Sequence, residues 1–463
     1  MAAAELRRQL AVERITSARA CRLLEVIPNA ALPCDESRER RRRAFSALAR
    51  RSIRLDNLTH SLAGLIMGDA AVAWRQRAGA ALTPRQRSAV LTTAVLANNL
   101  PDFDFAYVGV TSGKLGYLLH HRGHTHTLAA VLPLALICLA VVALGFRLWR
   151  PAPSRADLAR LVLLAAAGGV LHVLMDFGNN YGVHPFWPAY DGWFYGDAIF
   201  IIEPWLMILL IGMAGGVSRS RWLRGALLVA LAGLLALAWS VAIAGPSLAL
   251  ALGVFSLPWV LWLWRSSFRQ RWLRGGSALV LGALVLLGTR QVVRASARES
   301  LAAASEPGLE LVDVITTPAP GNPLCWWLLT VQRSERRYVV REAVASGWPW
   351  LSSAARCPFM NDGQTAPIQP SSLRSGRDVV WGPEFDAPLA ELVRLRRESC
   401  VARAFLRFAR VPYWVRRGER FTLVGDLRFD RSSAVEFADL PLAADAPCPR
   451  FEPSWLPPFA AAD

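Results

Sequence analysis

Apolar and polar positions divide the chain into three parts. The long apolar runs are concentrated in the middle, and most approach the ~20 residues that a membrane-spanning helix needs. Four runs stand out, at 127–146, 198–217, 225–244 and 277–293, and two more, at 161–178 and 248–264, are slightly short or carry polar ends. The pattern predicts an all-α polytopic membrane helix bundle.

The remainder of the chain after residue 293 changes character. Apolar runs shorten to strand length at 325–331, 337–340, 402–408 and 420–428, and turn residues separate them. We expect a C-terminal α+β domain with an antiparallel sheet. Four of the seven cysteines lie in this part, at Cys325, Cys357, Cys400 and Cys448. An even number favours disulfides in an oxidising compartment, and free buried cysteines are the alternative.

The expected domains are therefore a basic extension at 1–55, the membrane bundle at 56–293 and the tail at 294–463. The coherent pattern begins at residue 56, so the extension is either an appended segment or the product of a start codon placed too far upstream. Its many arginines fit poorly with the membrane orientation that the loops indicate.

The formal net charge of +17 reflects arginines that flank the apolar runs. They gather in four loops, at 75–87, 147–160, 219–224 and 265–274, whereas the connections 179–197 and 245–247 contain no Lys or Arg. The positive-inside rule places the four arginine loops in the cytoplasm. We expect a multi-pass inner (plasma) membrane protein with an extracytoplasmic tail. The lipid bilayer is its expected partner, and nucleic acid is not.

Histidine is confined to one region of the chain. All seven histidines lie between His60 and His184, and four of them fall in the run 120–126. Aspartates share the region, and the predicted topology brings these side chains to the same outer end of the bundle. Neutral imidazole is the commonest ligand of transition metals, and mixed nitrogen and oxygen ligands suit zinc. We expect a divalent metal, zinc or alternatively manganese.

Two aspartate-containing motifs have ligand spacing. His172 and Asp176 are four residues apart in a span, so a helix places both on one face. Ionisable groups at membrane depth are costly and usually functional, although a hydrogen-bonded structural pair is the alternative. Asp102 and Asp104 would share one side of an extended segment, or one of them would cap a helix or turn.

The run from residue 120 to 126 contains more candidate ligands than can coordinate a single ion. His120 with His124 or His126 is the favoured ligand set, and the others would orient ligands or transfer protons. His121 is a candidate for proton transfer, and Arg122 suits a phosphate or carboxylate. A histidine-rich solvent loop is the alternative.

Three further residues complete the expected site. His60 is either a ligand or a structural histidine. Asp197 is a candidate ligand in the arginine-free connection. Glu203 lies in the apolar run 198–217. Placing a carboxyl group there costs free energy, which favours a catalytic role.

In this order, these motifs resemble the YdjM-type family of membrane-bound metal-dependent hydrolases. The matching phrases are Asp-Asn-Leu-Thr-His-Ser-Leu at 56–62, Asn-Leu-Pro-Asp-Phe-Asp at 99–104, His-His-Arg-Gly-His-Thr-His-Thr at 120–127, His-x-x-x-Asp at 172–176, Gly-Asp at 196–197 and Ile-Glu-Pro at 202–204. Pro-Gly-Asn-Pro-Leu at 320–324 and Gly-Asp-Leu-Arg-Phe at 425–429 are similar to longer members. The family more often has Asp at the position of Glu203.

The resemblance implies a hydrolase in which a metal-activated water attacks a lipid or envelope-associated ester. The order of the motifs is also similar to zinc-dependent phospholipases C and zinc nucleases, which would make the substrate a phosphodiester. A membrane metal-binding or transport protein without hydrolysis is the alternative. The polar residues cluster at one end of the spans, which favours a site over an ion path.

Overall fold

The computed structural model describes residues 36–111, 113–145, 154–216, 220–240, 245–304, 306–359, 364–417, 421–430, 437–443 and 446–459. The chain divides into two compact units, Met1–Ala47 and Leu48–Asp463, and the candidate ligands and the tail belong to the second. Residues 1–35 of the expected extension and 147–153 of the arginine loop 147–160 lie outside the described residues, as does Arg219.

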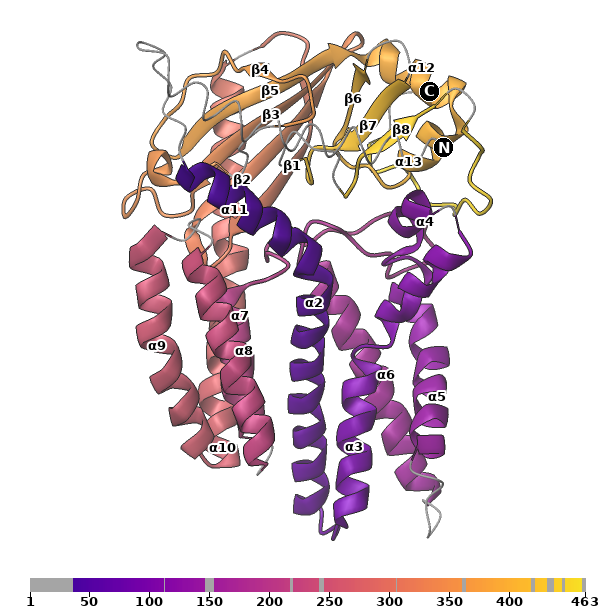
Figure 1. The fold of residues 1–463 in the computed structure, drawn as a ribbon, viewed down its shortest axis with the longest axis vertical. Helices are drawn as coiled ribbons and strands as arrows, with labels where there is room; N and C mark the ends of the chain where they lie inside the picture. Colours follow the sequence, from indigo (N-terminus) through magenta and orange to yellow (C-terminus); the bar gives the residue numbers. More distant parts are fainter. Residues whose placement is uncertain are drawn as a thin grey trace. The chain divides into compact units, whose positions relative to one another are not determined.

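A first group of helices precedes the connection at 178–203 (Figure 1). It comprises α2 (Glu36–Arg77), α3 (Pro84–Ala97), α5 (Leu128–Gly145) and α6 (Arg155–Phe177). Thr83 starts α3 through a capping box with Gln86, and Ser154 caps α6. Gly168 lets α6 approach α3 closely, since a Cβ there would lie 2.9 Å from the Asn98 side-chain nitrogen.

The second group follows that connection. It comprises α7 (Pro204–Gly215), α8 (Arg221–Ser240), α9 (Gly245–Arg265), α10 (Phe268–Arg271), η3 (Trp272–Gly276) and α11 (Ser277–Ala304). Within the described residues, four helices are long and apolar enough to cross a membrane: Leu128–Gly145, Arg155–Phe177, Arg221–Trp239 and Phe268–Ala304. The predicted helical membrane region is therefore confirmed.

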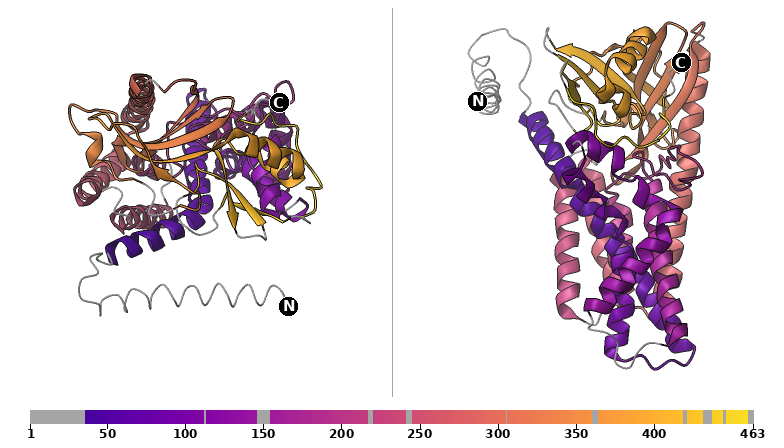
Figure 2. Two further views of the ribbon diagram at one scale, coloured as in Figure 1. Left: turned by 90° about the horizontal axis from the view of Figure 1, so that it is seen from above. Right: turned by 90° about the vertical axis from the view of Figure 1, so that its right-hand side faces the viewer.

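Two helix boundaries differ from the apolar pattern. The run 198–217 becomes helical only at Pro204, so Glu203 caps the helix and does not lie inside it. The last span continues past Val293 to Ala304. It does so because Val293, Ala297 and Leu301 are buried against the tail sheet, where Trp326 also packs. Figure 2 shows α11 extending beyond the other helices along the strands.

The tail is an antiparallel α+β region, as predicted. Its larger sheet has the order β1-β2-β3-β5-β4, and its smaller sheet has the order β6-β7-β8. The strands are β1 (Glu310–Ala319), β2 (Asn322–Arg333), β3 (Arg337–Ser346), β4 (Gln369–Pro370), β5 (Val379–Pro388), β6 (Pro412–Arg417), β7 (Phe421–Asp426) and β8 (Leu440–Leu442). Helices α12 (Leu389–Glu398) and α13 (Cys400–Phe405) connect β5 to β6.

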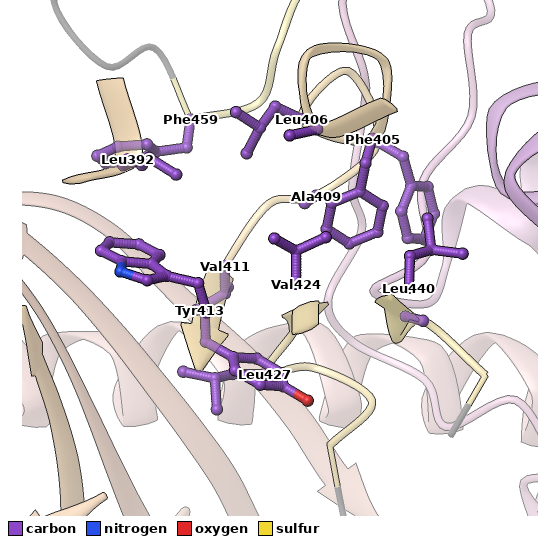
Figure 3. Packing of buried hydrophobic residues seen from close by; sticks show 14 of the residues in the cluster. Leu392, Phe405, Leu406, Ala409, Val411, Tyr413, Val424, Leu427, Leu440 and Phe459 are labelled. Carbon is purple, nitrogen blue, oxygen red and sulfur yellow. The ribbon is translucent and has the colours of Figure 1, made fainter. Parts of the chain in front are cut away.

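Aromatic and aliphatic side chains from both sheets form the main core of the tail. Figure 3 shows Phe405, Val411, Tyr413 and Val424 among the packed side chains. Two disulfides, Cys325–Cys357 and Cys400–Cys448, cross-link this region. The expected disulfides are therefore present, with a pairing that the sequence left open.

Candidate metal centre

Four buried side chains converge where the first helix group meets the tail. Asp102, His126, His172 and Asp176 each offer one ligand atom, and these atoms lie within 4.8 Å of one another. All four residues are between 0% and 7% exposed. His172 and Asp176 share a face of α6, Asp102 lies in the first turn of η1 (Pro101–Gly109), and His126 ends η2 (His124–His126). This His2Asp2 group could hold a metal ion.

The distances between the ligand atoms fit a small tetrahedral ion. His126 Nε2 lies 3.0 Å from both His172 Nε2 and Asp176 Oδ2, and 3.4 Å from Asp102 Oδ1. His172 Nε2 lies 3.3 Å from Asp176 Oδ2 and 3.5 Å from Asp102 Oδ1. Zinc ligands lie about 2.0–2.1 Å from the ion, so the edges of a regular tetrahedron are about 3.3–3.4 Å. The residues present therefore fit zinc.

Local backbone geometry selects these residues from the longer list of candidates. The segment after Pro101 is a 3-10 helix, not an extended strand, and it places Asp102 in the ligand group and Asp104 against His121 and the Arg122 backbone. Helix α4 (Gly113–His120) ends at His120, and Arg122 then takes a left-handed φ of 60°. Because the helix stops there, His120 and His124 do not share a helix face as they would in a continuous helix.

A second layer of hydrogen bonds fixes the two imidazoles. His172 Nδ1–H donates to the Asn98 carbonyl at 2.7 Å, which leaves Nε2 as the lone-pair nitrogen. On the other imidazole, His126 Nδ1 lies 3.4 Å from Asp104 Oδ2, so the same tautomer is favoured. Asp104 thus lies behind His126 and orients it.

Asp104 is itself held by three donors. It accepts from His121 Nδ1 at 2.9 Å, from the Arg122 backbone N–H at 2.8 Å and from Thr125 Oγ1 at 3.0 Å. Burial disfavours its charged form, but the charge and hydrogen bond of His121 outweigh burial and hold the pKa of Asp104 well below its ordinary range.

The second oxygen of Asp176 is also occupied. Arg122 Nη2 lies 2.9 Å from Asp176 Oδ1, and Arg122 Nη1 donates to Asn179 Oδ1 at 2.9 Å. His60 Nε2 approaches the same Asp176 oxygen at 3.3 Å, and its ring stacks on His172 with 3.9 Å between centroids. Arg122 and His60 therefore contact a member of the group and lie beside it.

The electrostatic environment favours a cation at the centre. Burial raises the pKa of Asp102, but the neighbouring imidazoles of His126 and His172 outweigh burial and lower it far below the ordinary value. Burial lowers the pKa of His126, but the carboxylates of Asp102, Asp104 and Asp176 around its ring favour the protonated form and raise the pKa well above the ordinary value. Carboxylates that favour a proton on this imidazole also favour a divalent cation beside it.

Three histidines lie in a separate aromatic cluster that also includes Trp187 and Trp455. His120 Nε2 is 3.4 Å from the Phe451 carbonyl, and His124 packs on Trp187 and Trp455. His184, which the sequence did not single out as a ligand, stacks on Trp455 with 3.8 Å between centroids. Burial lowers the pKa of His120 and of His124, and lowers that of His184 to about 3.

Asp197 and Glu203 also lie outside the group. Arg410 binds Asp197 through two hydrogen bonds of 2.8 and 3.0 Å. Glu203 accepts from the Gly321 backbone N–H at 3.3 Å, at the turn between β1 and β2. Burial raises the pKa of Glu203 to about 8. Both carboxylates thus bind parts of the tail.

Sequence reasoning did not single out the contacts of Asn98 and Asn179. The available signal was a pair of adjacent asparagines at the end of each apolar segment, Asn98-Asn99 and Asn179-Asn180.

Comparison with known proteins agrees with the motifs of the site. Residues 55–246 match the family model of the YdjM inner membrane protein. Over these residues, which we call the YdjM segment, the chain is similar to the YdjM inner membrane protein family. The YdjM segment contains all four members of the metal group, so the resemblance inferred from the sequence is confirmed there. With its candidate spans, the chain is a multi-pass inner membrane protein.

The chain is also similar to the "Uncharacterized protein YfhP" of Bacillus subtilis (strain 168). The two are 28% identical over 167 residues, which are 35% of this chain and 47% of the relative. The alignment thus spans about half the length of that relative. No solved structure matches the chain.

Proposed function

We propose that this protein is a metal-dependent hydrolase of the inner membrane. Its divalent ion, zinc or alternatively manganese, would be held by Asp102, His126, His172 and Asp176. The observation that carries the proposal is the near-tetrahedral separation of four buried ligand atoms, 3.0–3.5 Å in five of the pairs. A bound ion of this kind activates water as a nucleophile near neutral pH.

The surrounding residues would position ligands and move protons. Asp104 and the Asn98 carbonyl keep the Nε2 atoms of His126 and His172 directed at the centre. Arg122 contacts Asp176 and Asn179, so we assign it the positioning of Asp176 and not the binding of a phosphate. His121 donates from Nδ1 to Asp104 and is our candidate for proton transfer.

A lipid-borne or envelope-associated ester is the proposed substrate class. Buried acidic and exposed aromatic side chains alternate along η1. Asp102 and Asp104 are buried, and Phe103 and Phe105 are exposed. The two phenylalanine rings stack with 6.0 Å between centroids. They follow the end of α3, and aromatic side chains are enriched where spans meet the membrane surface. An ester at the headgroup level would therefore lie beside Asp102. A phosphodiester is the first ester to test.

We also propose that the site and the tail face away from the cytoplasm. The arginine-rich connections and the metal group fall at opposite ends of the helices, and Figure 1 shows α10 at the end remote from α4 and the strands. The two disulfides of the tail support an oxidising compartment.

A metal-binding role without turnover is the second candidate. The observation that favours it is the completeness of the ligand set, because four buried protein ligands are typical of structural zinc sites and catalytic sites keep one position open. Under the hydrolase proposal Asp102, with a side chain 9% exposed, would be the ligand that yields to water.

Turnover separates the two candidates. The full chain in detergent, loaded with zinc or manganese, is assayed on bis(p-nitrophenyl) phosphate and on dispersed phospholipids, beside the His172→Ala/Asp176→Ala double variant. Metal-dependent hydrolysis that the double variant lacks would support the hydrolase. Full metal retention with no hydrolysis of either substrate would favour the second candidate.

A further inference from the structure

The metal group is joined to the tail through a short loop of the YdjM segment. Residues 178–181 follow α6 directly, and Asn179 and Tyr181 are each 7% exposed. Arg122 approaches the loop from the metal side, and Arg428 approaches it from the tail. The phrase Gly-Asp-Leu-Arg-Phe at 425–429 supplies Arg428, and the proposed function gave this phrase no role.

On the metal side, Asn179 connects the loop to a ligand. Its Oδ1 accepts from Arg122 Nη1 and from the Tyr181 backbone N–H, both at 2.9 Å. The other terminal nitrogen of Arg122 lies 2.9 Å from Asp176 Oδ1. Arg122 also lies over the Tyr181 ring at 5.2 Å. The position of Asp176 therefore depends on where this loop holds Asn179.

On the tail side, one buried guanidinium holds the loop backbone. Arg428 Nη1 donates to the Asn180 carbonyl at 2.6 Å and to the Tyr181 carbonyl at 3.4 Å. Its Nη2 donates to the Phe408 carbonyl at 3.2 Å and to Asp426 at 2.7 Å. Arg428 is 2% exposed. Lysine cannot reproduce this planar set of donors.

We propose that Arg428 is a positioning residue for the metal centre, acting through the loop 178–181, Asn179 and Arg122 on the ligand Asp176. The C-terminal domain is then a structural component of the site and not an independent module. The inference rests on the proposed metal site. Changes to groups that orient metal ligands typically weaken metal binding by about 10- to 100-fold.

The test measures zinc affinity, which does not depend on turnover. Zinc dissociation constants are obtained by competition with a chromophoric chelator for the full chain, Arg428→Lys and Arg337→Lys. Arg337 forms a half-exposed ion pair with Asp386 in the same domain, so it serves as the matched control. We expect Arg428→Lys to bind zinc at least about ten-fold more weakly and Arg337→Lys to bind as the unaltered chain does.

A second measurement uses the unaltered chain and decides the matter if Arg428→Lys does not fold. If Arg428 affects zinc binding, zinc binding must affect the segment around Arg428 equally. Zinc should therefore slow hydrogen exchange in residues 423–430 and leave the exchange rates of α12 unchanged. Unchanged zinc affinity in a folded Arg428→Lys, or unchanged exchange at 423–430, would overturn the inference while the metal site stands. An unaltered chain that binds no zinc would overturn the proposed function and this inference with it.

Discussion

Two histidines of the same run provide the sharpest test of the ligand set. His126 lies in the group, whereas His124 packs between Trp187 and Trp455. Glutamine replaces either imidazole with a side chain of similar reach and no charge. Structural zinc sites bind with about 10–16 kcal/mol, so one ligand of four is worth on the order of 2.5–4 kcal/mol. His126→Gln should therefore weaken zinc binding by about 10²- to 10³-fold.

The assay is chelator competition on the full chain in detergent, with His124→Gln as the matched control. His124→Gln should change the zinc affinity by less than about three-fold, because its ring touches no member of the group in the described residues. Equal losses in the two variants, or a larger loss in His124→Gln, would refute the assignment of His126 and the tetrahedral geometry argued from it.

The remaining predictions concern the tail and its attachment. Asp197→Asn removes one of the two carboxylates that pair with the buried Arg410, and Asp313 remains as the other, so it should lower the free energy of unfolding by about 1–3 kcal/mol without loss of zinc; zinc loss would return Asp197 to the ligand set. Cys400→Ser opens a cross-link between positions 48 residues apart and should cost about 4 kcal/mol in thermal unfolding, so an unchanged melting temperature would contradict it. Burial raises the pKa of Glu203 to about 8 from its ordinary 4.5, so its stabilising contribution is complete below about pH 4.5 and lost as the pH rises through about 8. Glu203→Gln should flatten melting temperature against pH in that window, and an unchanged profile would contradict this.

The parts of the site that the sequence predicted share one helix or one short motif. The spacing of His172 and Asp176 fixes their common face on α6 wherever that helix lies. The apolar runs predicted the membrane helices, and the shorter runs predicted an antiparallel tail, because both depend on local periodicity.

The parts that the sequence left open depend on irregular backbone and on distant partners. The 3-10 helix after Pro101 gives Asp102 and Asp104 different neighbours, and the left-handed residue Arg122 separates His120 from His126. Neither feature has a periodic signal. Asp197 resembled a ligand until the fold brought Arg410 to it across 213 positions of the chain. Composition cannot show such a pairing.

Metal content tests the central claim most directly. The detergent-purified full chain is analysed for zinc and manganese by elemental analysis, before and after reloading, beside the His172→Ala/Asp176→Ala double variant. We predict a stoichiometric divalent ion in the unaltered chain and its loss in the double variant. An unaltered chain that holds no ion after reloading, or a double variant that holds as much as the unaltered chain, would contradict the account.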